Sequence, residues 1–204
     1  MPTLAPTYQR FAPSRVLGTM SVDAWADFLH TAAQKSNYVY GEVVEVAGAS
    51  PEHNLIAMNT AVALRNALDA LGSGCDVLGS DQKIAVASVL YYFPDLCVVC
   101  GEWQVDRFDA LQNPTAIIEV LSPTTERDDR TDKFLEYQQL ATLEHYILID
   151  QSRVAVTHFE KLAVGLWAIS GDYRATTDTL TLRLGEESVM VPLTQIYRRV
   201  FTER

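Results

Sequence analysis

The sequence predicts an α/β (α+β) protein with a mixed central β-sheet flanked by helices. Three observations support this. Strand-like segments dominate the middle of the 204-residue chain, helix-like segments lie on both sides of them, and two late strand-like segments suggest an additional hairpin. With 48% hydrophobic residues the chain can form one substantial core. We therefore expect a single domain over residues 20–204, preceded by an N-terminal arm over residues 1–19.

The first helix is predicted over residues 21–34, and a strand follows it. Ser21 suits the N-cap position, and Trp25 and Phe28 lie on one apolar face. Residues 38–46 have the composition of one strand, which ends at the Gly- and Pro-containing residues 48–51.

The second helix is predicted to begin at Pro51, which suits the first helical position because its missing N–H is not needed there. Apolar residues then recur at roughly helical spacing as far as Leu71, and Gly72 ends the helix.

The rest of the chain alternates short strands with two further helices. Strands are predicted around residues 76–78, 83–87, 96–100, 115–121, 146–149 and 154–159, a helix over about 127–140, a hairpin of 167–169 with 180–184, and a short helix after Pro192.

Composition excludes several classes of protein. A net charge of −10 counts against a non-specific nucleic-acid coat, but not against a hydrolase that gathers carboxylates around a metal. No stretch has the ~20 apolar residues of a membrane span, and the N-terminus lacks an apolar secretory segment. We therefore expect a cytoplasmic protein with no membrane partner. Cys97 and Cys100 lie on one strand and point to opposite faces, so we expect buried thiols rather than a zinc site.

Two predicted strands carry a carboxylate that an apolar pattern would not place there. Asp95 follows Pro94 just before one strand, and Glu119 lies in the middle of another. An unpaired buried charge costs on the order of several kcal/mol, so such a residue is paired, lies at a strand end or binds a cation. If the strands are neighbours, the two carboxylates converge and suit Mg²⁺. The alternatives are a turn-capping role for Asp95 and a salt bridge for Glu119.

The helix after the second carboxylate offers cations. Lys133 and Tyr137 are four residues apart and share a face, and Arg130 precedes Lys133 by three. An ammonium there could orient a water or stabilise a phosphate, and Arg127 and Arg130 could grip phosphate oxygens. The alternative is a solvated helix of alternating charge.

Five fragments in order carry a family resemblance: YGEVVEVAGASPEHN, SDQKI, YYFPDLCVVC, IIEVLSPTTERDDRTDKFLEYQ and LEHYILID. Together they resemble the Uma2 family (formerly DUF820) of the PD-(D/E)xK superfamily, which implies a restriction-endonuclease-like core. The resemblance implies that Asp95, Glu119 and the carbonyl of Val120 bind the metal. It also implies that Lys133 replaces the superfamily lysine, whose usual position holds Leu121.

The resemblance also marks accessory positions and one departure. Glu42 and His53 match positions that the family tends to fill with the same residues, although His53 alone reads as a packing residue at a helix start. Asn37 and Tyr40 stand where family members usually carry acids. If either acid normally joins the metal shell, its loss would weaken metal binding or abolish activity.

These features lead to one functional expectation and two alternatives. We expect a Mg²⁺- or Mn²⁺-dependent endonuclease that hydrolyses phosphodiester bonds of nucleic acid, with DNA as the favoured substrate and a homodimer as the favoured assembly. The alternatives are a catalytically inactive binding or assembly module, and a hydrolase of a small phosphorylated substrate, which the negative net charge suits.

Overall fold

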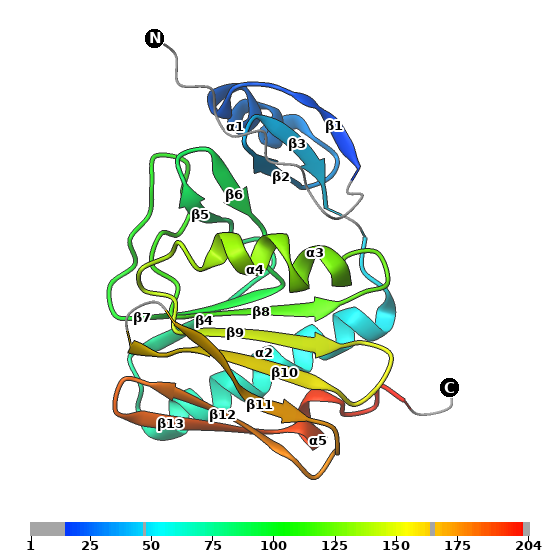
Figure 1. Ribbon diagram of the computed structural model, residues 1–204, viewed down its shortest axis with the longest axis vertical. Helices are drawn as coiled ribbons and strands as arrows, with labels where there is room; N and C mark the ends of the chain where they lie inside the picture. Colours follow the sequence, from blue (N-terminus) through cyan, green and yellow to red (C-terminus); the bar gives the residue numbers. More distant parts are fainter. Residues whose placement is uncertain (1–14, 47, 164–165, 202–204) are drawn as a thin grey trace.

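A six-stranded mixed sheet forms the centre of the protein (Figure 1). The structure, a computed structural model, describes residues 15–46, 48–163 and 166–201. The strands lie in the order β11 (Trp167–Tyr173), β10 (Val156–Lys161), β9 (His145–Asp150), β8 (Ala116–Leu121), β7 (Leu96–Cys100) and β4 (Cys75–Gly79). Only β8 and β9 are parallel neighbours in this sheet.

Each face of this sheet has its own cover. One face packs against α2 (Pro51–Leu71), the hairpin of β12 (Thr179–Leu184) and β13 (Glu187–Pro192), and α5 (Leu193–Ile196). The other face packs against α4 (Asp132–Tyr137), which follows α3 (Glu126–Arg130). In Figure 1, α2 passes behind the sheet. Because successive side chains of a strand alternate, Ile118 and Val120 point toward α2, and Ile117, Glu119 and Leu121 point toward α4.

Local sequence fixes where α2 begins and ends. The Ser50 hydroxyl accepts a hydrogen bond from the His53 amide at 3.1 Å, and Pro51 takes the first turn as predicted. Gly72 ends the helix in the left-handed conformation, with φ of 65°. The N-terminal turn of α2 therefore carries His53 in a fixed position.

A second sheet of five strands lies above the first in Figure 1. Its order is β1 (Val16–Thr19), β3 (Glu42–Glu45), β2 (Ser36–Val39), β6 (Leu90–Tyr92) and β5 (Ile84–Ala87). The helix α1 (Val22–Thr31) begins at Ser21, as predicted, and packs through fully buried Trp25 against the rings of Tyr38 and Tyr91.

The prediction of one strand over residues 38–46 is wrong. Tyr40 and Gly41, with φ of 50° and 97°, reverse the chain between β2 and β3. A tyrosine at the first position of such a turn gives no sequence signal, because Asn, Asp and Gly are the residues that favour it.

The predicted hairpin of residues 167–169 with 180–184 is also wrong. β11 pairs with β10, and β12 pairs with β13. The N-terminal arm differs at its end, where Val16–Thr19 form β1, while residues 1–14 lie outside the described part of the chain. The helix predicted over residues 127–140 is divided at Thr131, whose φ and ψ are −122° and −84°.

The cysteine prediction needs one correction. Cys100 is not a free thiol, because it forms a disulfide with Cys75, which lies directly opposite it in the β4–β7 pair. Cys97 is a buried free thiol, and burial raises its pKa to about 12. Within the described residues, every helix is too short or too polar to cross a membrane.

Candidate active site

Asp95 lies just before β7 and is held by two groups. Its Oδ2 accepts a hydrogen bond from the amide of Val120 at 2.7 Å. Its Oδ1 lies 2.8 Å from Nε2 of His53 in the first turn of α2. Because a carboxylate can only accept, Nε2 of His53 carries the hydrogen. Asp95 therefore connects β7, β8 and α2 at one end of the sheet.

Glu119 lies on β8 beside this contact and is almost fully buried, with 4% of its side chain exposed. Its Oε1 accepts hydrogen bonds from Nζ of Lys133 at 3.1 Å and from the Tyr137 hydroxyl at 3.3 Å. Burial raises the pKa of Glu119 to about 8, the ammonium of Lys133 opposes this, and the charges of Asp129 and Asp95 add to it. The structure thus joins Glu119, Lys133 and Tyr137 directly, and Asp95 contacts the amide of Val120, the residue after Glu119.

Lys133 is shared between two carboxylates. Besides Glu119, its Nζ contacts Oδ1 of Asp129 at 2.7 Å, as a close ion pair rather than a well-directed hydrogen bond. Burial alone would lower the pKa of Lys133, but the carboxylates of Asp129, Glu119 and Asp128 together raise it above its ordinary value. Lys133 is therefore a protonated cation in the interior.

The helices α3 and α4 turn an acidic face inward. Asp129, Asp132 and Glu136 are 1%, 0% and 2% exposed, and the Tyr92 hydroxyl donates to Glu136. The alternative of a solvated helix is wrong for this face. Sequence reasoning missed Asp129, although its spacing of four residues from Lys133 placed both on one side.

Two predicted accessory residues lie away from Glu119. Arg130 pairs with Glu126 one turn earlier in α3, with 2.9 Å between Nε and Oε1. Glu42 is the first residue of β3 and pairs in register with Val39 of β2. The other two are in contact with the acids, since His53 bonds Asp95 and the Tyr137 hydroxyl donates to Glu119.

The two positions that lack the usual acids differ in their surroundings. Asn37 is buried, and its Oδ1 accepts the Phe93 amide at 3.0 Å, which ties β2 to the segment that leads to Asp95. Tyr40 is 46% exposed in the β2–β3 turn. Asn37 is thus linked through its side chain to the segment that carries Asp95, and the Tyr40 amide donates to the Val89 carbonyl before β6.

The oxygens at this place fit a hard divalent cation. The amide and carbonyl of one strand residue point to the same side, so the Val120 carbonyl faces the side from which Asp95 approaches its amide. Each carboxylate oxygen of Asp95 has a second lone pair, and both hydrogen bonds to Glu119 go to Oε1, so Oε2 could face a cation. Among the described residues, no three His, Cys, Asp or Glu side chains gather as metal ligands. The backbone oxygen and water would have to complete the shell, as is common for Mg²⁺.

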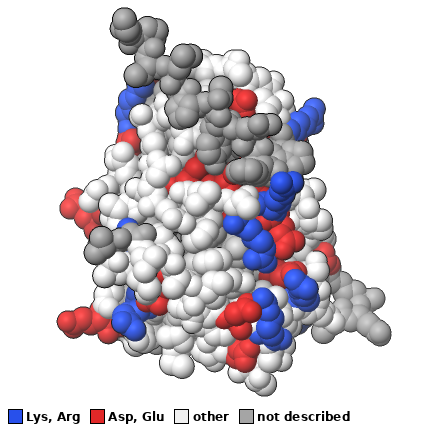
Figure 2. All heavy atoms as spheres, in the orientation of Figure 1, with Lys and Arg blue, Asp and Glu red and all other residues white. Residues whose placement is uncertain are grey.

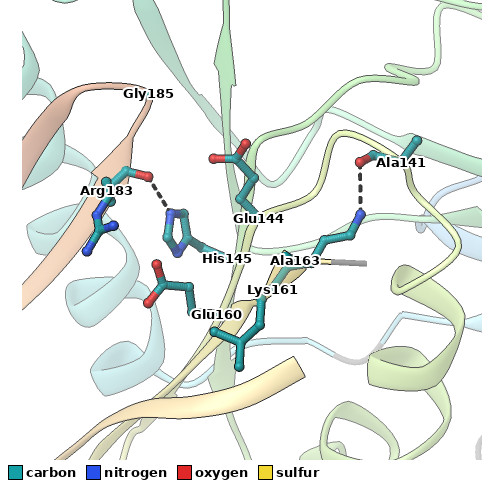
Figure 3. Close-up of a pocket in the computed structure, with 9 residues that line it drawn as sticks. Ala141, Glu144, His145, Glu160, Lys161, Ala163, Arg183 and Gly185 are labelled. Carbon is teal, nitrogen blue, oxygen red and sulfur yellow. Dashed lines mark hydrogen bonds between the residues drawn. The ribbon is translucent and has the colours of Figure 1, made fainter. Parts of the chain in front are cut away.

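A pocket of about 420 Å³ lies elsewhere (Figure 3). Figure 3 shows His145, the first residue of β9, with its ring bonded to the Arg183 carbonyl. His145 is aligned with Ala116 at the start of β8, and it shares the α2 face with Ile147. The pocket therefore lies at the opposite end of the strands from Glu119.

The charges on the face shown in Figure 2 do not form a continuous basic surface. Lys and Arg side chains alternate there with Asp and Glu, and broad neutral areas separate them. A long nucleic acid lying on this face would gain little from non-specific electrostatic attraction.

Known proteins resemble this chain over most of its length. The Uma2 family model, described as "Putative restriction endonuclease", matches residues 25–191. Two proteins of Synechocystis sp. (strain ATCC 27184 / PCC 6803 / Kazusa) are similar. "Uncharacterized protein sll1609" is 30% identical over 161 residues, 76% of this chain and 90% of its own length. "Uncharacterized protein slr1290" is 29% identical over 173 residues, 84% of this chain and 89% of its own length.

A solved structure supports the fold. It is the crystal structure of a "putative nuclease belonging to DUF820" from Anabaena variabilis ATCC 29413. The similarity has a TM-score of 0.65 at 12% sequence identity, and it covers 86% of this chain and 98% of that chain. At this identity the likeness concerns the fold alone, and it confirms the predicted fold class.

Proposed function

Because the chain belongs to the Uma2 family, whose model describes a restriction endonuclease, we propose that it is a Mg²⁺- or Mn²⁺-dependent endonuclease acting on DNA. One observation carries the proposal. The carboxylate of Asp95, just before β7, accepts a hydrogen bond from the amide of Val120, the residue after Glu119, and the ammonium of Lys133 donates to Glu119.

Each residue has a role that its contacts support. Asp95, Glu119 and the Val120 carbonyl would hold the cation, which when bound polarises a phosphate and lowers the pKa of a water. His53 and the Val120 amide fix the orientation of the Asp95 carboxylate. Lys133 would orient the attacking water or offset the charge that develops on the phosphate. A homodimer would supply the second site needed to cut both strands of a duplex.

Cleavage assays test the proposal. The purified protein is incubated with single- and double-stranded DNA and with RNA, in Mg²⁺, in Mn²⁺ and in a chelator. We expect cleavage that requires the metal. Asp95→Asn and Glu119→Gln should each lower it at least about 100-fold, as expected when several kcal/mol of transition-state stabilisation are lost.

A matched control distinguishes the loss of a site carboxylate from the loss of any negative charge. Glu102→Gln removes a carboxylate that is exposed between β7 and β8, and it should cut like the wild type. If folded Asp95→Asn and Glu119→Gln proteins cut as fast as the wild type, this assignment of residues is wrong.

A second candidate function is a non-catalytic binding or assembly module. This candidate is favoured by the hydrogen bonds that other groups of the protein already donate to both Asp95 and Glu119. Val120 and His53 hold Asp95, and Lys133 and Tyr137 hold Glu119. Calorimetry with Mn²⁺ separates the two, since a folded wild type that binds no divalent ion supports the module.

A further inference from the structure

The buried ammonium of Lys133 has a nearer partner than Glu119. Its Nζ is 2.7 Å from Oδ1 of Asp129 and 3.1 Å from Oε1 of Glu119. Both acids are nearly inaccessible, with 2% and 4% of their side chains exposed. One cation thus lies between two carboxylates, one on α3 and one on β8.

This arrangement creates a competition at Glu119. A divalent cation bound by Glu119 would lie close to the ammonium of Lys133, and like charges in a weakly solvated interior repel strongly. The ammonium and the metal would therefore compete for the same carboxylate unless another acid holds the ammonium. Asp129 is that acid.

The fold fixes Asp129 for this purpose. It precedes Lys133 by four residues, and the interruption at Thr131 lies between α3 and α4. Its backbone carbonyl accepts a hydrogen bond from the buried Tyr146 hydroxyl at 2.8 Å. The carboxylate is therefore presented from an anchored part of the backbone.

We propose that Asp129 is a positioning residue that retains the Lys133 ammonium beside the site and so leaves Glu119 available to the metal. The inference rests on the proposed function, because it assumes a divalent cation at Glu119. It assigns to Asp129 an action on the metal that passes through Lys133, not direct ligation.

A double-mutant cycle read out by Mn²⁺ affinity tests this. Calorimetry is performed on the wild type, Asp129→Asn, Lys133→Met and the double variant, with the fold of each checked by circular dichroism. Asp129→Asn should weaken Mn²⁺ binding about tenfold, the scale on which outer-shell partners act. Lys133→Met should tighten binding. In the Lys133→Met background, Asp129→Asn should change the affinity less than about threefold.

Controls keep each outcome decisive. Glu126→Gln removes a partly exposed carboxylate of the same helix and should leave the affinity unchanged. If Lys133→Met does not fold, Lys133→Gln replaces it in the cycle. Equal weakening by Asp129→Asn in both backgrounds would overturn the inference alone, because Asp129 would then act on the metal directly. A wild type that binds no Mn²⁺ overturns the proposed function and the inference together.

Discussion

Glu119 shows how one residue can reveal a site. It lies in a strand whose other five residues are aliphatic and buried, and a buried carboxylate is costly unless something positive meets it. The structure supplies Lys133 and Tyr137 from α4. The buried acid is tolerated because α4, which follows β8 in the chain, places the ammonium of Lys133 beside it.

His53 is the residue whose part in the site is easiest to test. His53→Phe keeps a ring but removes the donor to Asp95, so the carboxylate would keep only the Val120 amide. We expect about tenfold weaker Mn²⁺ binding in calorimetry, because outer-shell partners orient metal ligands.

A conservative variant provides the control. His53→Gln retains an N–H at a similar distance from the backbone, and it should recover most of the lost affinity. If His53→Phe binds Mn²⁺ as tightly as the wild type, His53 is only a packing residue at the start of α2.

The sequence identified part of the site and missed the rest for a physical reason. Asp95 and Glu119 stand out because each interrupts an apolar pattern, and Lys133 follows from helical spacing. Asp129 does not stand out, since an acid in a run of Glu, Arg and Asp has the pattern of a solvated helix. Its burial depends on how α3 packs against β8, which local pattern does not encode.

At the scale of elements, local signals predicted helix ends well and strand partners poorly. Ser50, Pro51 and Gly72 mark the ends of α2 by local chemistry. The pairing of β11 with β10 and of β12 with β13 is instead a choice between similar strands, decided by which faces they bury. A strand can recognise several partners, so composition alone suggested the wrong hairpin.

Four strands are joined by a partly buried chain of hydrogen bonds. The Arg183 carbonyl can only accept, so Nε2 of His145 carries a hydrogen, at 2.7 Å. Nδ1 of neutral His145 then accepts from Nε2 of His158 at 2.9 Å, and Nδ1 of His158 accepts from the Ser170 hydroxyl at 2.8 Å. The chain links β12, β9, β10 and β11 while the imidazole of His158 is neutral.

This chain predicts a loss of stability in acid. Burial, and then the neighbouring His145, lowers the pKa of His158 from 6.5 to about 4. The unfolded state therefore binds more protons than the folded state between these values, so stability is complete above pH about 6.5 and falls as the pH is lowered toward about 4. The loss from this group is about 3 kcal/mol at most. Urea unfolding across this pH range measures it.

The comparison with His158→Gln isolates the effect, because other groups titrate in the same range. The variant should be less stable at neutral pH, and its unfolding free energy should change less between pH 6.5 and 4 than that of the wild type. Parallel pH curves for the two proteins would contradict the assignment to His158.

At the scale of the whole molecule, the net charge of −10 has a local explanation. A substantial part of the acidic surplus is buried around Lys133 and does not face solvent. Net charge is therefore a poor guide to what this protein binds, because the buried acids do not face an approaching polyanion.

The disulfide is a covalent link that restrains residues 75–100. Cys75 and Cys100 are separated by 25 residues, and the loop that they close contains β5, β6 and Asp95. Closing a loop of this size stabilises a protein by about 3 kcal/mol, mainly by limiting the unfolded chain.

Cys75→Ser with Cys100→Ser should therefore lower the free energy of unfolding by about that amount in guanidinium titrations without reductant. Dithiothreitol should bring the wild type to the same midpoint and leave the double variant unchanged. Thiol titration of the denatured wild type should find Cys97 alone before reduction and all three cysteines after it. Three reactive thiols before reduction would mean that β4 and β7 are held by backbone pairing alone.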